Sequence, residues 1–208
     1  MTLAPSTFDQ KAAAWDENPV RIRLAQNIAA AIRKNVVVTA DMTVLDFGCG
    51  TGLLTFDLAP SVTSVTGADT SQAMLDVLMS KAHARQQTNV HALALAMERS
   101  WPATYDLIVS SMALHHVEKT AALIADLFRA LKPSGTLCIA DLDAEDGSFH
   151  DDSTGVYHAG FDRATLRACF HDAGFSSVFD ETATTLTKPT RTGLRTFPIF
   201  LMIGKKMG

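Results

Sequence analysis

Strand-like and helix-like segments alternate along this chain from about residue 19 to residue 172. Short apolar runs that end in turns are each followed by a stretch with apolar residues at helical spacing. Strict alternation of this kind predicts a parallel sheet with helices on both faces and right-handed crossovers. Two last strands, 176–185 and 197–206, have no helix between them, which predicts one antiparallel strand at the C-terminal edge. We therefore expect an α/β fold with a doubly wound, seven-stranded, mostly parallel sheet.

Helices are expected where capping residues and apolar periodicity coincide. Pro19 stands in the first turn of one expected helix, and Ser71 and Asp162 are side chains that can cap two others. The apolar face of the helix that Ser71 begins is expected to run from Met74 to Met79. The expected helices are 19–35, 53–60, 71–85, 119–131 and 162–175, and the strands before the final pair are 42–48, 61–69, 89–96, 105–114 and 136–143.

The composition is that of an ordinary globular protein and excludes few functions. The chain has 208 residues, a net charge of −4 and no basic block, which speaks against a nucleic-acid partner. Three cysteines, with no C-x-x-C or H-x-x-x-H spacing, predict reduced thiols and no metal site. The first residues have neither a basic region nor an apolar core, and no apolar stretch is long enough to span a bilayer. We therefore expect a cytoplasmic protein without a membrane partner.

Three glycines at alternate positions, Gly48, Gly50 and Gly52, follow the first expected strand. Glycines in such a place permit a tight turn and let a ligand approach the main chain. Leu53 stands where a dinucleotide-binding fingerprint has its third glycine, and no phosphate-binding loop of the G-x-x-x-x-G-K type is present. Asp69 ends the next strand, where an acid commonly binds both ribose hydroxyls of a nucleoside. The pattern indicates a nucleoside that carries something other than a phosphate.

Four successive segments resemble the motifs of one family: VLDFGCGTG (44–52), VTGADTSQAML (65–75), YDLIVSSMALHHV (105–117) and LFRALKPSGTLCIAD (127–141). The family is the class I S-adenosylmethionine-dependent methyltransferases, and the resemblance is to the small-molecule branch of the ubiquinone and menaquinone biosynthesis type. FDQKAAAWDENP, at 8–19, is similar to the helical flap that precedes the sheet in that branch. The resemblance implies a Rossmann-like fold in a single domain, 1–208, with a flap at 1–40, a cofactor-binding core at 41–141, a lid loop at 142–161 and a C-terminal helix and strand pair at 162–208.

The resemblance also implies S-adenosylmethionine as the cofactor. The main chain of residues 48–50 and the Asp46 carboxylate would then hold its methionine part. Relatives often have an acid after the third strand that meets the adenine amino group, but Ala96 stands there in this chain. The backbone of Met97 remains available to adenine, and Trp15 in the flap is expected either to close over the cofactor or to pack against the sheet edge. The full set of expected cofactor contacts is Trp15, Asp46, Gly48, Cys49, Gly50, Asp69, Thr70, Met74, Ala96, Met97, Ser110 and Ser111.

Methyl transfer requires an aligned acceptor, exclusion of water and, for a hydroxyl acceptor, a general base. Side chains that can serve as this base are expected at the carboxyl ends of the fourth and fifth strands and in the long irregular segment 143–161. Each also has an ordinary structural interpretation. The histidine pair can pack the loop or cap the next helix, the acid can orient the loop, and the loop residues can lie on the surface. The candidates are His115, His116, Asp141, Tyr157 and His158.

The leading hypothesis is transfer of a methyl group from S-adenosylmethionine to a small-molecule acceptor by in-line displacement. The alternative is a non-catalytic, cofactor-binding or regulatory module, which the replacement of the usual acid by Ala96 favours. A nicotinamide-dependent oxidoreductase is disfavoured by Leu53 and by the antiparallel final strand pair. SSMA at 110–113, in place of an N-P-P-Y tetrapeptide, disfavours methylation of DNA bases. We expect a small-molecule substrate, no nucleic acid, and a monomer or homodimer.

Overall fold

The structure is a computed structural model that describes residues 7–95, 101, 104–191 and 193–208. The chain forms two compact units, Met1–Pro102 and Ala103–Gly208, and each is described by itself. The division into flap, core, lid and C-terminal part within a single domain stays a prediction. Within the described ranges, no helix is both long and apolar enough to cross a membrane.

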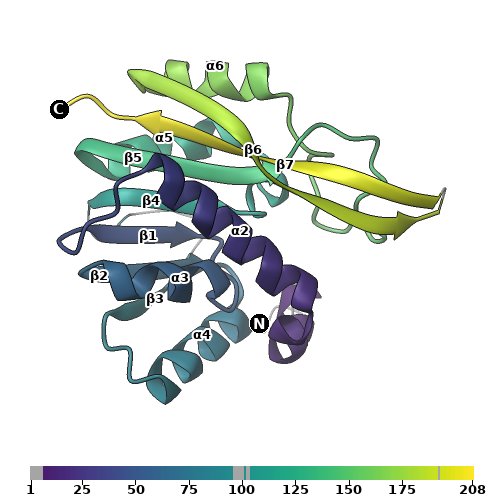
Figure 1. Ribbon diagram of the computed structural model, residues 1–208, viewed down its shortest axis with the longest axis horizontal. Coiled ribbons are helices and arrows are strands. Elements are labelled where there is room, and N and C mark those ends of the chain that lie inside the picture. The colour runs from purple at the N-terminus through teal and green to yellow at the C-terminus, as the bar shows by residue number, and fades with distance from the viewer. Residues whose placement is uncertain (1–6, 96–100, 102–103, 192) are drawn as a thin grey trace, which may run out of the picture. The chain divides into compact units, whose positions relative to one another are not determined.

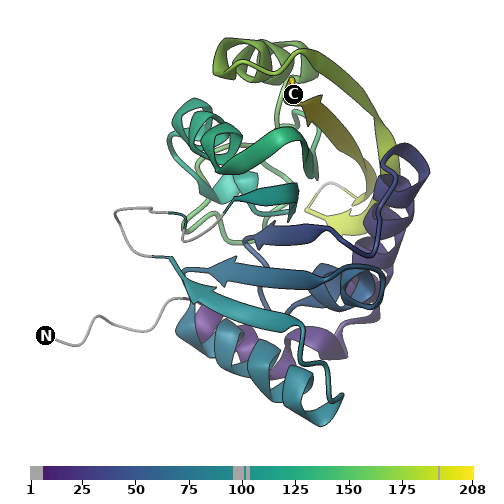
Figure 2. The same ribbon diagram turned by 90° about the vertical axis from the view of Figure 1, so that its left-hand side faces the viewer.

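The first unit is built on three parallel strands, β1 (Thr43–Phe47), β2 (Ser64–Asp69) and β3 (Val90–Ala94), in the order β3-β2-β1. Figure 2 shows them side by side as blue arrows, with the helix α4 (Gln72–Ala84) running along them. The run of buried residues in β1 is the pattern of a parallel strand covered on both faces. All three strands lie where the apolar runs of the sequence predict them.

The carboxyl ends of these strands carry the acidic residues of the first unit's candidate site. Asp46 pairs in register with Gly67, and Asp69 at the end of β2 pairs with Ala94. Because neighbouring parallel strands run in the same direction, their carboxyl ends meet at one edge of the sheet. The two carboxylates therefore come to the same edge.

Two helices of the first unit begin where the sequence predicts, one with Pro19 in its first turn and one with Ser71 as its cap. Asn18 accepts a hydrogen bond from the Val20 N–H and precedes a proline, and the Ser71 hydroxyl oxygen accepts one from the Met74 N–H. The expected apolar face of α4 is wrong at Met79, which is 40% exposed, because it lies about 100° around the helix from Leu78. The other helical segments of this unit are α1 (Thr7–Lys11), η1 (Ala12–Glu17), α2 (Pro19–Asn35), α3 (Leu53–Leu58) and η2 (Ala59–Ser61).

The second unit contains four strands, in the order β4-β5-β7-β6. β4 and β5 are parallel, while β7 is antiparallel to both β5 and β6. The strand order of the whole chain is β3-β2-β1-β4-β5-β7-β6, which confirms the predicted seven-stranded, mostly parallel sheet. The elements of this unit are β4 (Tyr105–Ser111), η3 (Leu114–His116), α5 (Thr120–Ala130), β5 (Leu131–Leu142), α6 (Arg163–Ala173), β6 (Ser177–Thr190) and β7 (Gly193–Lys205).

The hairpin of β6 and β7 is longer than the sequence pattern predicts. These two strands pair from Ser177 to Thr190, but β5 pairs with β7 only from Ile199 onward. Residues 185–190 and 193–198 therefore form a two-stranded extension, the hairpin arm, which reaches beyond β5 in Figure 1. The sequence pattern did not predict this part of β6, because Pro189 disfavours a strand. An edge strand nevertheless tolerates proline, and threonine suits a strand.

The start of β5 also differs from the expected helix-ending turn. The strand begins at Leu131, which pairs with Tyr105, and the next register pair is Leu107 with Thr136. Residues 132–135, which were expected to form the turn, lie between these two register pairs, where the pairing of β5 with β4 is irregular. Ser134 has a φ of 64°, so the chain does turn sharply there, but within the strand.

Candidate functional site

The glycine loop of the first unit, residues 48–52, has a left-handed backbone at each of its glycines. The φ angles of Gly48, Gly50 and Gly52 are 69°, 53° and 85°, which disfavour any residue with a β-carbon. A β-carbon on Gly52 would lie 2.3 Å from Leu78 Cδ1, so this glycine serves close packing against α4. A β-carbon on Gly50 would have only Met74 Sδ nearby, at 4.0 Å. The main chain at Gly50 is thus the part of the loop that a ligand can approach.

Asp69 links the glycine loop to the first turn of α4. Its Oδ2 atom accepts a hydrogen bond from the Gly50 N–H at 2.8 Å, and Oδ1 accepts one from the Ser71 N–H at 2.9 Å. An ionised carboxylate has about four acceptor positions, so two remain for the hydroxyls of a ribose. The geometry fits the role that the resemblance implies for this residue.

Asp46 is a buried acid beside the same loop. It is 1% exposed, and its Oδ2 atom accepts a hydrogen bond of 2.6 Å from the Thr55 hydroxyl. Burial raises the pKa of Asp46 from 3.8 to about 7, the negative charge of Asp69 adds to the rise, and the bond from Thr55 opposes it. A cationic group placed next to Asp46 would favour its ionised form, which fits an expected contact with an amino group.

The other expected cofactor contacts of the first unit differ in exposure. Burial raises the pKa of the Cys49 thiol well above its usual value, so the thiol stays protonated. The backbone of Cys49 is part of the glycine loop. Met74 is buried and Thr70 is exposed. Ala96 and Met97 lie outside the described residues, so the adenine contacts stay a prediction.

The N-terminal segment is tied to the glycine loop and to α4. Asp16 accepts hydrogen bonds from the Thr51 hydroxyl and from Lys81 Nζ, both at 2.5 Å, and Asp9 accepts one of 2.5 Å from the Ser71 hydroxyl. Trp15 lies instead under Arg21, whose guanidinium carbon is 3.8 Å from the centre of the ring. The closing of Trp15 over the cofactor stays a prediction.

In the second unit the structure brings two of the candidate catalytic residues together. His115 Nδ1 lies 2.7 Å from Asp141 Oδ1, and both side chains are buried. The backbone N–H groups of His115 and Leu142 also donate to this carboxylate, at 3.2 and 2.7 Å. Because a carboxylate accepts hydrogen bonds, the contact places the imidazole proton on Nδ1 and leaves the lone pair on Nε2. This is the arrangement of a base oriented by an acid.

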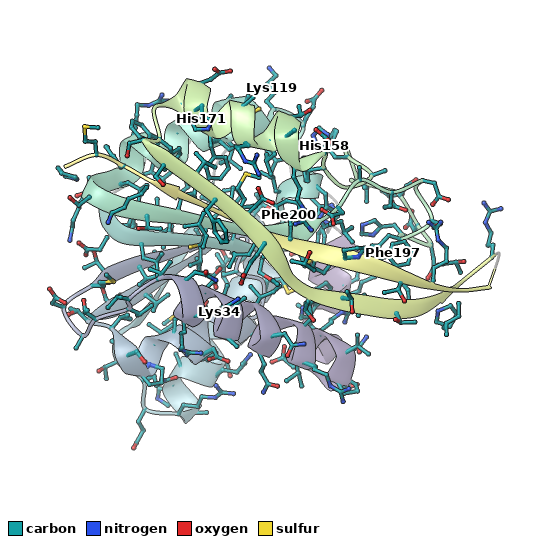
Figure 3. The ribbon with its side chains drawn as sticks, turned by 45° about the horizontal axis from the view of Figure 1, so that its top comes forward. Lys34, Lys119, His158, His171, Phe197 and Phe200 are labelled. Atoms are coloured by element: carbon teal, nitrogen blue, oxygen red, sulfur yellow. The ribbon has the colours of Figure 1, made fainter. Side chains whose placement is uncertain are left out.

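The remaining three candidates hold the long segment 143–161, the histidine-rich loop. His116 Nδ1 donates to the Gly155 carbonyl at 2.7 Å, and His158 Nε2 donates to the Val117 carbonyl at 3.0 Å. The backbone N–H groups of Tyr157 and His158 donate to the His115 carbonyl, while the Tyr157 side chain is 58% exposed. His158 is labelled in Figure 3. The contact of His116 is of the kind that packs the loop, one of the alternatives expected for it, and a catalytic role for all three residues stays a prediction.

The rings of His115, His116 and His150 form a cluster, the histidine cluster. His150 was not among the site residues predicted from the sequence. Its ring centre lies 4.9 Å from that of His115 and 5.8 Å from that of His116, and those two rings are 4.1 Å apart. Among the described residues His150 Nε2 is buried without a hydrogen-bond partner, and so is the hydroxyl of Ser110 in β4. The available signal was that His150 lies in a loop already expected to cover the site. In the described part of the chain, no group of three or more metal-ligating side chains is arranged to hold an ion.

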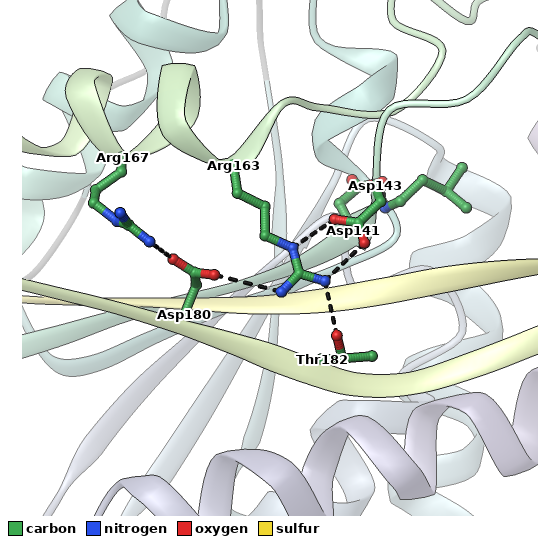
Figure 4. Close-up of polar contacts among 7 residues, drawn as sticks. Asp141, Asp143, Arg163, Arg167, Asp180 and Thr182 are labelled. Carbon is green, nitrogen blue, oxygen red and sulfur yellow. Dashed lines mark hydrogen bonds and ion pairs between the residues drawn. The ribbon is translucent and has the colours of Figure 1, made fainter.

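An ion-pair network fixes the first residue of the histidine-rich loop (Figure 4). Arg163 donates to both carboxylate oxygens of Asp143, at 2.6 and 2.7 Å, and to the Thr182 hydroxyl at 2.9 Å. Asp180 of β6 contacts both Arg163 and Arg167. These contacts raise the pKa of Arg163 and join the loop to α6 and β6.

Comparison with known proteins identifies the segment that carries the motifs. Residues 44–135 match the family described as "Methyltransferase domain". This segment is a methyltransferase domain. The resemblance to class I S-adenosylmethionine-dependent methyltransferases is therefore confirmed.

Two relatives and one solved structure illustrate what the chain is similar to. An uncharacterized methyltransferase of Schizosaccharomyces pombe is 31% identical over 154 residues, which cover 66% of this chain and 54% of the relative. A ubiquinone biosynthesis O-methyltransferase of Nitrosomonas europaea is 30% identical over 138 residues, covering 64% and 54%. Haemonchus contortus phosphoethanolamine N-methyltransferase 2, solved in complex with S-adenosyl-L-methionine, has a TM-score of 0.71 at 16% identity, covering 98% and 60%. The chain spans about half the length of the two relatives that it matches.

Proposed function

We propose that this chain binds S-adenosylmethionine at the carboxyl edge of β1 and β2 and transfers its methyl group to a small-molecule acceptor. The observation that carries the proposal is the Asp69 carboxylate, which accepts hydrogen bonds from the Gly50 and Ser71 N–H groups at 2.8 and 2.9 Å. These bonds hold the acid between the glycine loop and α4 with lone pairs left over for two ribose hydroxyls. When bound, the cofactor supplies a methyl group on a sulfonium sulfur that needs no further activation.

The residues that would hold the methionine part fit a zwitterionic group. Asp46, with a pKa of about 7, is close to half ionised at neutral pH and would favour an ammonium group beside it. A β-carbon at Gly50 would have only Met74 Sδ nearby, at 4.0 Å, so the backbone of Gly50 is open to approach.

His115 is the proposed general base. Its Nδ1–H donates to Asp141, so Nε2 is available to take a proton from a hydroxyl or ammonium acceptor. The Asp141 carboxylate would then stabilise the imidazolium that forms, and the N–H groups of His115 and Leu142 keep that carboxylate in place. A positioned base of this kind contributes about 10²–10⁴ in rate. His116, Tyr157 and His158 are proposed to order the loop over the acceptor.

Isothermal titration with S-adenosylmethionine and S-adenosylhomocysteine tests the first half of the proposal. Both ligands are expected to bind with dissociation constants well below millimolar. Failure of both to bind contradicts the proposal. Transfer of a labelled methyl group to a panel of small hydroxyl and amine acceptors tests the second half. Cofactor binding with no transfer to any of them would favour the alternative, a non-catalytic binding module. Cytoplasmic location and a monomeric or homodimeric state stay predictions.

A further inference from the structure

His150 is a half-buried member of the histidine cluster, and one of its ring nitrogens is buried. Its Nε2 atom is buried and has no hydrogen-bond partner among the residues that the structure describes. Buried polar atoms in native proteins are nearly always paired, so an exception calls for a ligand or water that completes the site. The ring centres of His115 and His116, the other members of the histidine cluster, lie 4.9 and 5.8 Å from the ring centre of His150.

The environment keeps the His150 ring neutral. Burial lowers the pKa of His150 from 6.5 to about 4, the positive charge that His115, His116 and Lys188 can carry contributes to the fall, and Asp141 opposes it. A neutral imidazole carries one N–H group and one lone pair. If the proton lies on Nδ1, the buried Nε2 presents a lone pair and requires a hydrogen donor; if it lies on Nε2, that atom presents an N–H group and requires an acceptor.

The ring is held from two sides. The preceding residue, Phe149, packs edge-on against Phe197 of the hairpin arm at 5.1 Å between ring centres, and its carbonyl accepts a hydrogen bond of 2.6 Å from Lys188. Figure 3 shows Phe197 on the arm. On the other side stands His115, which is fixed by Asp141. A side chain anchored in this way is suited to precise hydrogen bonding.

We propose that His150 carries its proton on Nδ1 and binds the methyl acceptor of the proposed function, through a hydrogen bond that its Nε2 accepts from an O–H or N–H group of the acceptor. The inference rests on the proposed function and adds the class of substrate: a small molecule with a hydroxyl or amine hydrogen next to an apolar body. The aromatic rings of Phe149 and of the cluster would line that body. A carboxylate or an ether oxygen would instead place its lone pairs against the lone pair of Nε2 and would be disfavoured.

Nuclear magnetic resonance of ¹⁵N-histidine-labelled protein with bound S-adenosylhomocysteine provides the test. The probes are phenol, benzyl alcohol and aniline, each paired with its methylated counterpart: anisole, benzyl methyl ether or N,N-dimethylaniline. At least one donor probe is expected to shift the Nε2 resonance of His150, and its methylated counterpart is expected to leave that resonance in place. If no donor probe shifts it, or if the paired probes shift it equally, the inference is overturned.

Two variants separate a direct contact from a general effect on the fold. His150→Phe keeps a ring but loses both nitrogens, and is expected to weaken binding of the donor probe about tenfold. His171→Phe, at an exposed position of α6, is the matched control and is expected to leave binding unchanged. Equal weakening in both variants would contradict the inference. Calorimetry with S-adenosylhomocysteine on the same samples tests the proposed function separately, because a failure to bind the cofactor is measured without any acceptor present.

Discussion

Asp46 and Asp69 are two carboxylates at one edge of a sheet, and their environments give them different tasks. Asp69 accepts two backbone hydrogen bonds, from the N–H groups of Gly50 and Ser71. Asp46 is buried beside Thr55, whose hydroxyl and backbone N–H both favour its ionised form, but burial outweighs them and raises the pKa of Asp46 to about 7. Asp46 thus gains or loses a proton near neutral pH. The binding of a ligand with a cationic amino group beside Asp46 would lower its pKa and favour the ionised form.

The first prediction concerns the pH dependence of stability. The pKa of Asp46 is raised in the folded state, so between about pH 4 and pH 7 the native protein binds more protons than the unfolded chain. The contribution of Asp46 to the free energy of unfolding therefore falls as pH rises through this window and levels off above it. Urea unfolding across the window is expected to show a smaller fall in Asp46→Asn than in the parent protein. An identical pH profile in the two proteins would contradict this assignment.

Asp69→Asn supplies the second prediction. An asparagine can accept only through its oxygen, so its amide NH₂ group would face one of the two N–H donors of Gly50 and Ser71. Loss of charged hydrogen bonds, each contributing about 1.5–3 kcal/mol, is expected to weaken S-adenosylhomocysteine binding by at least about tenfold. Isothermal titration measures the change. Asp76→Asn on α4, where the acid contacts only Gln72 in the described structure, is the control that should bind as the parent does.

Residues that end a strand or begin a helix could be predicted from the sequence. Asp69 and Ser71 stand at positions where a local pattern specifies the backbone, and the structure has both in the expected elements. The pairing of His115 with Asp141 depends on two parallel strands ending together, which the alternation also implies. His150 could not be placed in this way, because its position depends on how an irregular segment folds back on the hairpin arm.

At the scale of elements, the histidine-rich loop is the part of the second unit with the least regular structure and the most specific anchoring. Ala144 and Glu145 donate backbone hydrogen bonds to the carbonyls of Phe161 and Ala159, so its two ends run together. Arg163 holds its first residue through two bonds to Asp143. The loop is therefore closed at its base, and nearer its tip Arg195 and Lys188 of the hairpin arm donate to the Asp146 carboxylate and the Phe149 carbonyl.

The third prediction tests this closure with two glycines of similar backbone conformation. Gly160 and Gly155 have φ angles of 69° and 74°, so alanine is strained at either place by about 1–2 kcal/mol. A β-carbon at Gly160 would also lie 2.1 Å from the Asp143 carbonyl oxygen, whereas one at Gly155 would meet nothing within 4 Å. Gly160→Ala is thus expected to lower the free energy of unfolding clearly more than Gly155→Ala, as measured by urea denaturation. Equal losses would show that the base of the loop is not closed as described.

Sequence patterns located the elements better than their lengths. Pro19, Ser71 and Asp162 mark helix starts that the structure confirms. The hairpin arm was underestimated because Pro189 and a polar, threonine-rich composition look like a loop when no neighbouring strand is known. A strand pair beyond the edge of a sheet depends on contacts distant in sequence, and single-sequence periodicity does not contain them.

At the scale of the whole molecule, the proposed roles are divided between the two compact units. Asp46, the glycine loop and Asp69 belong to the first unit, while His115 and Asp141 belong to the second. Cofactor binding and acceptor chemistry can therefore be disturbed separately by single substitutions. This separation distinguishes the two candidate functions, an enzyme and a non-catalytic binding module, because only the enzyme requires the second set of groups.

The last prediction uses His115→Gln, Asp141→Asn and the double variant. If His115 is a base that Asp141 positions, the two act as a unit, and the double variant should transfer methyl groups no more slowly than the slower single variant. Each single loss is expected to lower the rate by about 10²–10⁴. All three proteins should keep the thermal stabilisation by S-adenosylhomocysteine, which is about 2.7 kcal/mol at a ligand concentration of about 100 times Kd. A non-catalytic module predicts instead the same stabilisation with no transfer in the parent protein, so the parent's rate decides between the two functions.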